Sequence, residues 1–282
     1  MGMLYRNAIV AALCAAVLCG SNSVASAFDD SKYPDLSGQW RRTATGPARY
    51  DPTKPNGRGQ QAPLKEEYRL LHEASMADQA SGGQGLDNAY KCIPMGMPRQ
   101  MSGTFPIEFV VTPKLTHILF ELVIYSTRRI YTDGRTFPTD EDPTYAGYSI
   151  GKWLDSDGDG RYDVLEVETR NLKGPRTFDE TGIPFPENNQ TVIKERFFLD
   201  KADPNLLHVE MTTIDDALTR PWAATKDYRR QTKVFWTESN CTEGNTHVAV
   251  GKENYFISAD GYLMPVRKDQ APPDLRYFKT RK

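Results

Sequence analysis

The chain contains 282 residues, of which 26% are charged, and its formal net charge at pH 7 is −2. Charges of both signs are interspersed along the sequence, without runs rich in lysine and arginine. A protein that binds nucleic acid needs a basic face, so we expect no nucleic acid partner.

The first 27 residues have the features of a secretory signal peptide. Arg6 supplies a positive charge, residues 8–18 form an apolar run, and residues 25–27 form a small-residue cleavage site. The apolar run is shorter than the roughly 20 residues that cross a bilayer. We therefore expect cleavage before Phe28 and secretion to the periplasm or beyond, without a membrane anchor.

Two cysteines remain after the signal peptide, Cys92 and Cys241. In an oxidising compartment a lone pair of cysteines usually forms a disulfide bond. The closed loop would span about 150 residues and stabilise the fold by about 4–5 kcal/mol in the chain-entropy model. We predict this disulfide. The alternative, a nucleophilic cysteine, would need a nearby histidine and a reducing environment.

The mature chain begins with a strand pattern and one helix pattern. Residues 36–42 predict a first strand that carries a G-x-W element, and the proline- and glycine-rich residues 46–62 predict a loop. Residues 63–80 predict a helix with Pro63 in its first turn. Four apolar residues at helical spacing predict its buried face: Leu64, Tyr68, Leu71 and Met76.

An extended loop, residues 92–99, follows the helix. It contains Met95 and Met97, and Met101 comes shortly after it. Methionine is flexible and polarizable, so these side chains either line an adaptable apolar pocket or fill gaps beneath the loop.

The rest of the chain is dominated by short strand patterns separated by turn residues. Asp133 and Gly134 form a hairpin turn signal, and the 255 residues left by cleavage suit one large domain, residues 28–282. Strand patterns and helix patterns do not alternate along the sequence, so we expect an all-β fold with one helix. The specific prediction is an antiparallel, lipocalin-like β-barrel with long Pro/Gly-rich loops. The predicted strands are residues 105–112, 115–125, 126–132, 145–154, 162–170, 191–199, 206–214, 223–230, 246–255 and 262–266.

An aspartate-rich turn between two of these strands has the spacing of a calcium loop. Ca²⁺ takes six to eight oxygen ligands, and this spacing supplies several in a short stretch. The flanking residues read as strands, so we expect a hairpin pinned by a structural Ca²⁺ rather than an EF-hand. The alternative is a polar, glycine-rich turn. The candidate ligands are Asp155, Asp157, Asp159, the carbonyl of Arg161, and Asp163.

The strand before this hairpin carries alternating charged and aromatic residues. Arg129 and Tyr131 share one face of it, and such a face could clamp a carboxylate or a phenol. The alternative is a surface ion-pair network at the barrel rim. The candidate ligand-binding residues are Arg129, Tyr131, Arg135, Tyr148, Trp153, Arg196 and Trp222.

Glu121, Tyr131 and Glu195 are the candidate acid–base residues. Glu121 lies in an apolar strand, and a buried carboxyl group has a raised pKa suited to proton transfer. Neutralisation by Arg129 or Arg196 is the alternative. The four histidines have no metal-binding spacing, and the sequence lacks a phosphate-cradling glycine loop, so we expect no organic cofactor.

Six short elements of the mature chain occur together in one family. They are LSGQW at residues 36–40, CIPMGMPR at 92–99, the stretch 128–153, KERF at 194–197, TRPW at 219–222 and the late Cys-x-Glu at 241–243. With these elements the chain resembles a family of secreted, largely uncharacterised bacterial proteins with a lipocalin-like (calycin-like) β-barrel. The chain departs from that family in its expanded aspartate-rich turn. It also has Pro184, Phe185 and Pro186 where a Pro-His-Ser element often stands. If that histidine acts in relatives, this protein lacks their reaction.

Three functions follow from these patterns. The first is a periplasmic β-barrel protein that binds a small, partly apolar or aromatic ligand. The alternative is a cofactor-independent lyase, isomerase or dehydratase that uses acid–base residues inside the barrel. A third is a calcium-dependent carbohydrate module with Trp153, Trp222 and Trp236 as stacking platforms.

Overall fold

The computed structural model describes residues 28–43, 61–91, 93–121, 127–234, 236, 247–250, 253–257 and 262–272. The chain divides into two compact units, residues 1–30 and 31–282, and all of the strands belong to the second. The predicted signal peptide lies outside the described residues, as do both cysteines of the predicted disulfide, Cys92 and Cys241.

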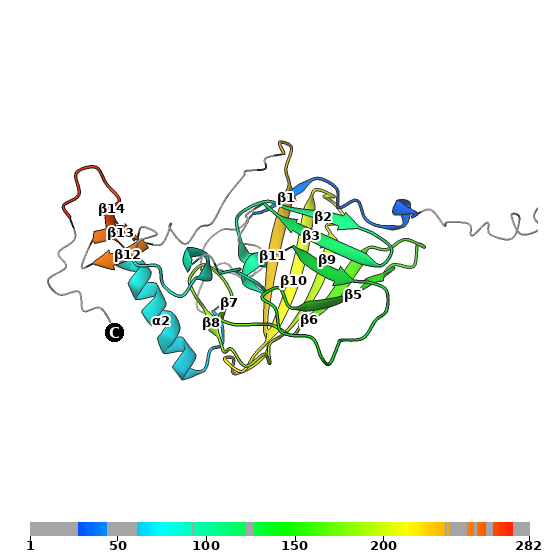
Figure 1. The fold of residues 1–282 in the computed structure, drawn as a ribbon. Helices are drawn as coiled ribbons and strands as arrows, with labels where there is room; N and C mark the ends of the chain where they lie inside the picture. The colour runs from blue at the N-terminus through cyan, green and yellow to red at the C-terminus, as the bar shows by residue number, and fades with distance from the viewer. Residues whose placement is uncertain are drawn as a thin grey trace, which may run out of the picture. The chain divides into compact units, whose positions relative to one another are not determined.

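Nine strands close into a barrel (Figure 1). Their order around the barrel is β1-β11-β10-β9-β6-β5-β4-β3-β2, and β2 pairs with β1 to close the ring. The predicted all-β class is therefore confirmed, and α2 (Glu66–Ala80) is the α-helix among the described residues. The barrel strands are β1 (Gln39–Arg42), β2 (Ile107–Val111), β3 (Leu115–Phe120), β4 (Arg128–Tyr131), β5 (Tyr148–Leu154), β6 (Val164–Arg170), β9 (Val192–Leu199), β10 (Leu206–Ile214) and β11 (Trp222–Arg230).

One neighbouring pair of the barrel, β4 with β5, runs parallel, and the other pairs are antiparallel. A closed ring with an odd number of strands cannot alternate direction throughout, so at least one pair must be parallel. Parallel neighbours cannot be joined by a tight turn. Residues 132–147 therefore form a long connection, here called the crossover. The hairpin predicted at Asp133 and Gly134 is wrong, because the proline-containing residues that follow do not form a strand.

Strand alternation divides each strand between the barrel interior and the outer surface. On β9, Ile193, Glu195 and Phe197 are buried, whereas Lys194 and Arg196 are exposed. The same period runs along β10 and β11. It explains why these stretches form strands: each presents one continuous row of side chains to the core.

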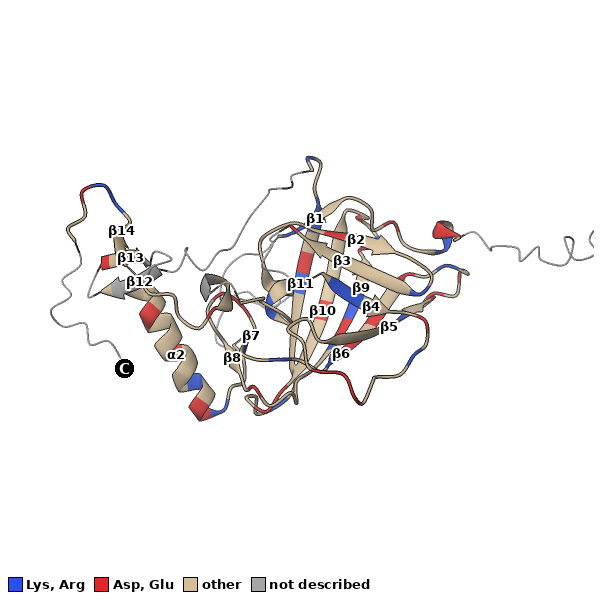
Figure 2. Ribbon diagram, in the orientation of Figure 1, with Lys and Arg blue, Asp and Glu red and all other residues tan. Residues whose placement is uncertain are grey.

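The outer face of β6, β9 and β10 carries a ladder of ion pairs (Figure 2). Arg196 lies between Glu166, at 3.3 Å, and Glu210, at 3.1 Å. Lys194 lies 3.7 Å from Glu168 on the same face. Exposed pairs of this kind each stabilise a fold by about 0–1 kcal/mol, so the ladder contributes little to the stability of the barrel.

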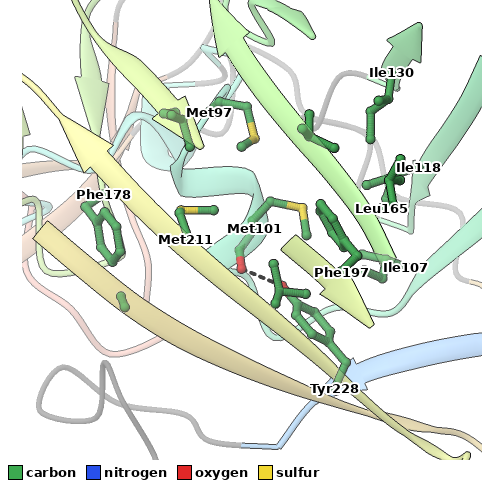
Figure 3. Packing of buried hydrophobic residues seen from close by; sticks show 14 of the residues in the cluster. Met97, Met101, Ile107, Ile118, Ile130, Leu165, Phe178, Phe197, Met211 and Tyr228 are labelled. Carbon is green, nitrogen blue, oxygen red and sulfur yellow. Dashed lines mark hydrogen bonds between the residues drawn. The ribbon is translucent and has the colours of Figure 1, made fainter. Parts of the chain in front are cut away.

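Side chains from a neighbouring loop enter the packed interior (Figure 3). Met97 and Met101 are fully buried and belong to the same apolar cluster as Met211 and Phe197. The hydroxyl of Tyr228 donates a hydrogen bond of 2.5 Å to the carbonyl of Met101. Met101 belongs to the short helix η4 (Arg99–Ser102), which this bond ties to the barrel wall. Of the two roles predicted for these methionines, the structure supports gap filling.

Helix α2 turns a partly polar face inward. Of the predicted apolar face, Leu64 and Tyr68 are half-buried against the core, whereas Leu71 and Met76 are 50% and 44% exposed. His72 and Ser75 continue the inward face: His72 lies 2.9 Å from the hydroxyl of Thr181, and Ser75 donates to the Thr181 carbonyl at 3.0 Å. The segment packed against this part of the helix offers polar groups, so the apolar pattern is right at the start of the helix and wrong further along.

Two small sheets complete the described fold. The hairpin β7 (Arg176–Thr177) with β8 (Pro184–Phe185) lies in a region expected to be loop, and α2 contacts β8. The other sheet comprises β12 (His247–Val250), β13 (Glu253–Ile257) and β14 (Leu263–Pro265). Within the part of the chain that the structure describes, no helix has the length and apolar character needed to cross a membrane.

Candidate functional site

A pocket of about 500 Å³ opens where the crossover returns along the outside of β4 and β5. This volume lies within the range of about 300–1,000 Å³ that is usual for small-molecule sites. We call it the crossover pocket. Its lining residues are Thr127, Arg129, Tyr131, Glu141, Pro143, Thr144, Tyr145, Ala146, Gly147, Tyr148 and Lys173.

Aromatic rings form much of the wall of this pocket. Tyr131 on β4 and Tyr148 on β5 stack with ring centroids 5.0 Å apart and an interplanar angle of 25°. They can meet because each points outward from one of two adjacent strands. Tyr145 in the crossover supplies a third ring. Stacked, held rings are suited to contact a flat apolar ligand.

Backbone hydrogen bonds fix the crossover against the segment after β6. Thr144 forms a parallel bridge with Leu172, and the Lys173 amide donates to the Thr144 carbonyl at 2.8 Å. The side chain of Asn171 donates to the carbonyls of residues 141 and 142, at 2.9 and 3.3 Å. The pocket is thus largely preformed, which lowers the entropy cost of binding.

Gly96 sets the other boundary of the crossover. The Met97 amide donates to the Tyr145 carbonyl at 2.9 Å, which brings the two backbones together. A Cβ atom on Gly96 would lie 2.2 Å from that carbonyl oxygen, and Gly96 has φ of +61°. Only glycine accommodates both the approach and the left-handed conformation.

Charged groups beside the pocket differ in whether they have partners. Arg135 forms a short ion pair with Asp133 and lies 3.9 Å from the centroid of the Tyr131 ring. Hydrogen bonding from Arg135 lowers the pKa of Asp133 to about 2. By contrast, within the described residues neither Arg129 nor Lys173 forms an ion pair. The pocket therefore contains two cations that have no carboxylate partner among the residues that the structure describes.

A second polar cluster lies inside the barrel. Arg128 binds Glu195 through two parallel hydrogen bonds, one of them 2.9 Å from Nη1 to Oε1. Its remaining donors reach the hydroxyls of Thr169, at 2.9 Å, and Ser149, at 3.3 Å. Both charged side chains are at most 1% exposed. Each of the three nitrogens of this guanidinium donates within the protein, so the cluster serves the fold rather than an incoming ligand.

Lys226 on β11 is an interior lysine that the sequence analysis did not single out. Its Nζ atom donates to the Ser102 hydroxyl at 2.6 Å and lies 4.4 Å from the centroid of the Phe178 ring. Burial, with the nearby charge of Arg42, lowers the pKa of this amine to about 7. The alternation of Trp222, Ala224, Lys226 and Tyr228 would have revealed its inward position.

The predicted ligand-binding residues fall into three places. Arg129, Tyr131 and Tyr148 line the crossover pocket, and Arg135 hydrogen-bonds to the Tyr148 hydroxyl at 3.1 Å. Trp153 and Trp222 are buried, at 7% and 3% exposure. Trp153 packs against Tyr33, and Trp222 packs against Phe178 at 4.3 Å between ring centroids. Arg196 belongs to the outer ion-pair ladder.

The three candidate acid–base residues are not brought together on one face. Tyr131 lies on the outer side of the barrel wall, stacked on Tyr148. Glu195 lies inside, bound to Arg128. Glu121 is 2% exposed just after β3. Arg128, the immediate neighbour of the predicted Arg129, is thus the partner of Glu195.

The aspartate-rich turn brings together three of its five candidate ligands. Carboxylate oxygens of Asp155, Asp157 and Asp159 lie within 4.8 Å of one another, and all three residues are exposed. Asp163 instead accepts hydrogen bonds from the amide and hydroxyl of Ser156. The turn borders an open cleft of about 810 Å³, which Arg161 also lines. The three converging carboxylates have the oxygen chemistry that Ca²⁺ prefers.

Adding Ca²⁺ is expected to raise the melting temperature of the protein. At a concentration about 100-fold above the dissociation constant, binding would stabilise the fold by about 2.7 kcal/mol, or roughly 5 °C for a chain of this size. Differential scanning calorimetry with Ca²⁺ and with a chelator measures the shift. Asp157→Asn should abolish it, whereas Asp142→Asn, an exposed acid in the crossover, should not. An unchanged melting temperature in the wild type contradicts the metal site.

No protein-family model matches this chain, and neither a curated protein nor a solved structure matches it. The resemblance to secreted lipocalin-like proteins stays a prediction from the sequence, whereas the barrel itself is described directly by the strand pairing.

Proposed function

We propose that this protein is a periplasmic β-barrel protein that binds a small, partly apolar or aromatic ligand, and that the crossover pocket holds the ligand. The observation that carries the proposal is a preformed pocket of about 500 Å³ with three tyrosines in its wall. Two of them are already stacked, so little side-chain entropy is lost when a ring docks against them.

The barrel interior gives less support for a ligand site. Its centre is occupied by large side chains that are fully buried, among them Phe197, Met97 and Met101 (Figure 3). A ligand there would have to displace packed side chains, whereas one in the crossover pocket would not.

The enzymatic alternative also has less support. A lyase, isomerase or dehydratase with Glu121, Tyr131 and Glu195 would need these groups to reach one substrate. Tyr131 and Glu195 point to opposite sides of the barrel wall, and Glu195 is held by Arg128. The carbohydrate alternative relied on three exposed tryptophans, but Trp153 and Trp222 are buried, and of the three Trp236 is exposed, at 48%.

The identity of the ligand can be sought by native mass spectrometry of the protein purified from its own producing cells. A mass excess that is released on denaturation identifies a retained small molecule. That compound, or an aromatic compound found in a binding screen, then serves as the probe for the pocket.

Removing the Tyr148 ring should weaken binding of this probe. Aromatic contacts contribute about 0.5–1.5 kcal/mol beyond burial, so Tyr148→Ala should raise the dissociation constant roughly tenfold in isothermal titration calorimetry. Tyr148→Phe keeps the ring and should bind almost as the wild type does. Tyr262→Ala removes an exposed tyrosine elsewhere and should have no effect. Equal binding by Tyr148→Ala and the wild type rules out the crossover pocket.

A further inference from the structure

We infer that the ligand of the crossover pocket is an aromatic carboxylate whose negative charge is neutralised by Arg129 and Lys173. This inference rests on the proposed function, since it specifies the chemistry of the compound held in that pocket. It does not follow from the aromatic walls, which would suit a neutral ring equally well.

The first support is the contrast between paired and unpaired cations in this part of the surface. Arg135 is paired with Asp133, and Arg170 with Glu168 at Nε–Oε1 2.5 Å. Within the described residues, Arg129 has neither a hydrogen bond nor an ion pair from its side chain. A guanidinium that lines a pocket without a carboxylate partner has its planar fork of donors available to an anion.

Lys173 supplies a second cation on the crossover side of the same pocket. Its Nζ atom lies 5.5 Å from the centroid of the Tyr145 ring. This cation–π contact orients the ammonium group but does not neutralise its charge, because the ring has no net charge. The Lys173 backbone is anchored to Thr144 at 2.8 Å, so the side chain starts from a fixed position. Arg129 and Lys173 therefore belong to different walls of a preformed pocket.

The charge balance favours a monoanion. The lining contains two cations, Arg129 and Lys173, and one carboxylate, Glu141. The net charge of the lining is therefore one positive charge, which one carboxylate group neutralises. A phosphate monoester, with close to two negative charges at neutral pH, would leave an excess negative charge beside Glu141.

The aromatic residues determine where the rest of such a ligand lies. With its carboxylate between the two cations, a planar ring of the ligand would contact the tyrosine side chains that line the same pocket. The Tyr131 ring is in contact with both Arg135, at 3.9 Å, and Tyr148, at 5.0 Å between ring centroids, so we expect the ligand to contact Tyr145 and Tyr148 instead.

The test uses matched pairs of probes: benzoate, cinnamate, 2-naphthoate and indole-3-acetate, each beside its own primary amide. Titration calorimetry on the full chain should show that the wild type binds the carboxylates at least about tenfold more tightly than the amides, as expected for hydrogen bonds to a charged group. The difference should shrink as salt is added, because the site is open to solvent.

Arg129→Met and Lys173→Met together should abolish the preference for carboxylate and leave weak binding of the amides. Arg129→Lys keeps the charge and should retain part of the preference. Arg220→Met, which removes an exposed arginine outside the pocket, should change nothing. Melting temperatures of all variants confirm that they fold.

Two results would overturn the inference in different ways. If the amides bind as tightly as the carboxylates and Tyr148→Ala weakens both, the pocket binds aromatic ligands but does not select for charge. If neither class binds, the proposed function itself fails. If the variant with both Arg129→Met and Lys173→Met still prefers carboxylates, other residues bind the carboxylate group, and this result also contradicts the inference.

Discussion

Glu195→Ala should lower the free energy of unfolding by about 3–5 kcal/mol, the range found when one partner of a buried ion pair is removed. The guanidinium of Arg128 would remain inside the barrel with only the hydroxyls of Ser149 and Thr169 as partners. A buried charge without a counter-charge is unfavourable because the surrounding protein solvates it poorly. Urea denaturation of the wild type and the variant measures the difference.

The matched control is Glu210→Ala, which removes a glutamate of the outer ladder. Its partner Arg196 remains in contact with water and with Glu166, so the expected loss is at most about 1 kcal/mol. A double variant, Arg128→Met with Glu195→Leu, should recover most of the stability lost by Glu195→Ala. If Glu195→Ala and Glu210→Ala lower the free energy of unfolding by the same amount, the ion pair of Arg128 and Glu195 does not stabilise the barrel more than an exposed pair does.

Lys226→Met should change how stability depends on pH. In the unfolded chain a lysine loses its proton near pH 10.4, whereas burial lowers the pKa of Lys226 in the folded protein to about 7. Between these values the unfolded state binds more protons than the folded state, so stability rises with pH. Below pH 7 the amine is charged in both states, and the folded protein then holds a buried cation.

The measurement compares the free energies of unfolding of the wild type and Lys226→Met from pH 6 to pH 9. Above pH 7 the difference between them should change by up to about 1.4 kcal/mol per pH unit in favour of the wild type. Below pH 7 the methionine variant should be the more stable of the two, despite the lost hydrogen bond to Ser102. A difference that is constant across this range would show that Lys226 does not titrate inside the fold.

Most of the barrel strands could be predicted because alternation is a local property of the sequence. Residues 206–214 were predicted as a strand with the bounds that β10 has, and the hairpin of β5 and β6 was predicted around its aspartate-rich turn. The parallel pairing of β4 with β5 could not be predicted in this way. Strand direction depends on the number of strands that close the ring, which no single segment encodes.

The assignment of faces was less predictable where both faces of a strand carry polar residues. In β4, alternation places Arg128 on the face of Ile130, which is buried, yet nothing nearby in the sequence indicates what neutralises a buried arginine. Its partner is Glu195, which is far away in the sequence. Lys226 was overlooked for a related reason, because lysine inside a barrel contradicts composition-based expectation.

Under the proposed function, the crossover separates barrel closure from ligand contact. For the ring to close, residues 132–147 only have to connect the end of β4 to the start of β5, because the hydrogen bonds that pair the strands are made by residues of the strands themselves. Side chains in this segment can therefore be exchanged widely without changing the packed interior, provided that the anchors at Thr144 and Tyr145 are kept and that Gly147, where a Cβ atom would lie 2.6 Å from the buried Leu172, stays glycine. The segment is accordingly a natural place to diversify binding preference, by mutation during evolution or by a designed library, on an unchanged barrel.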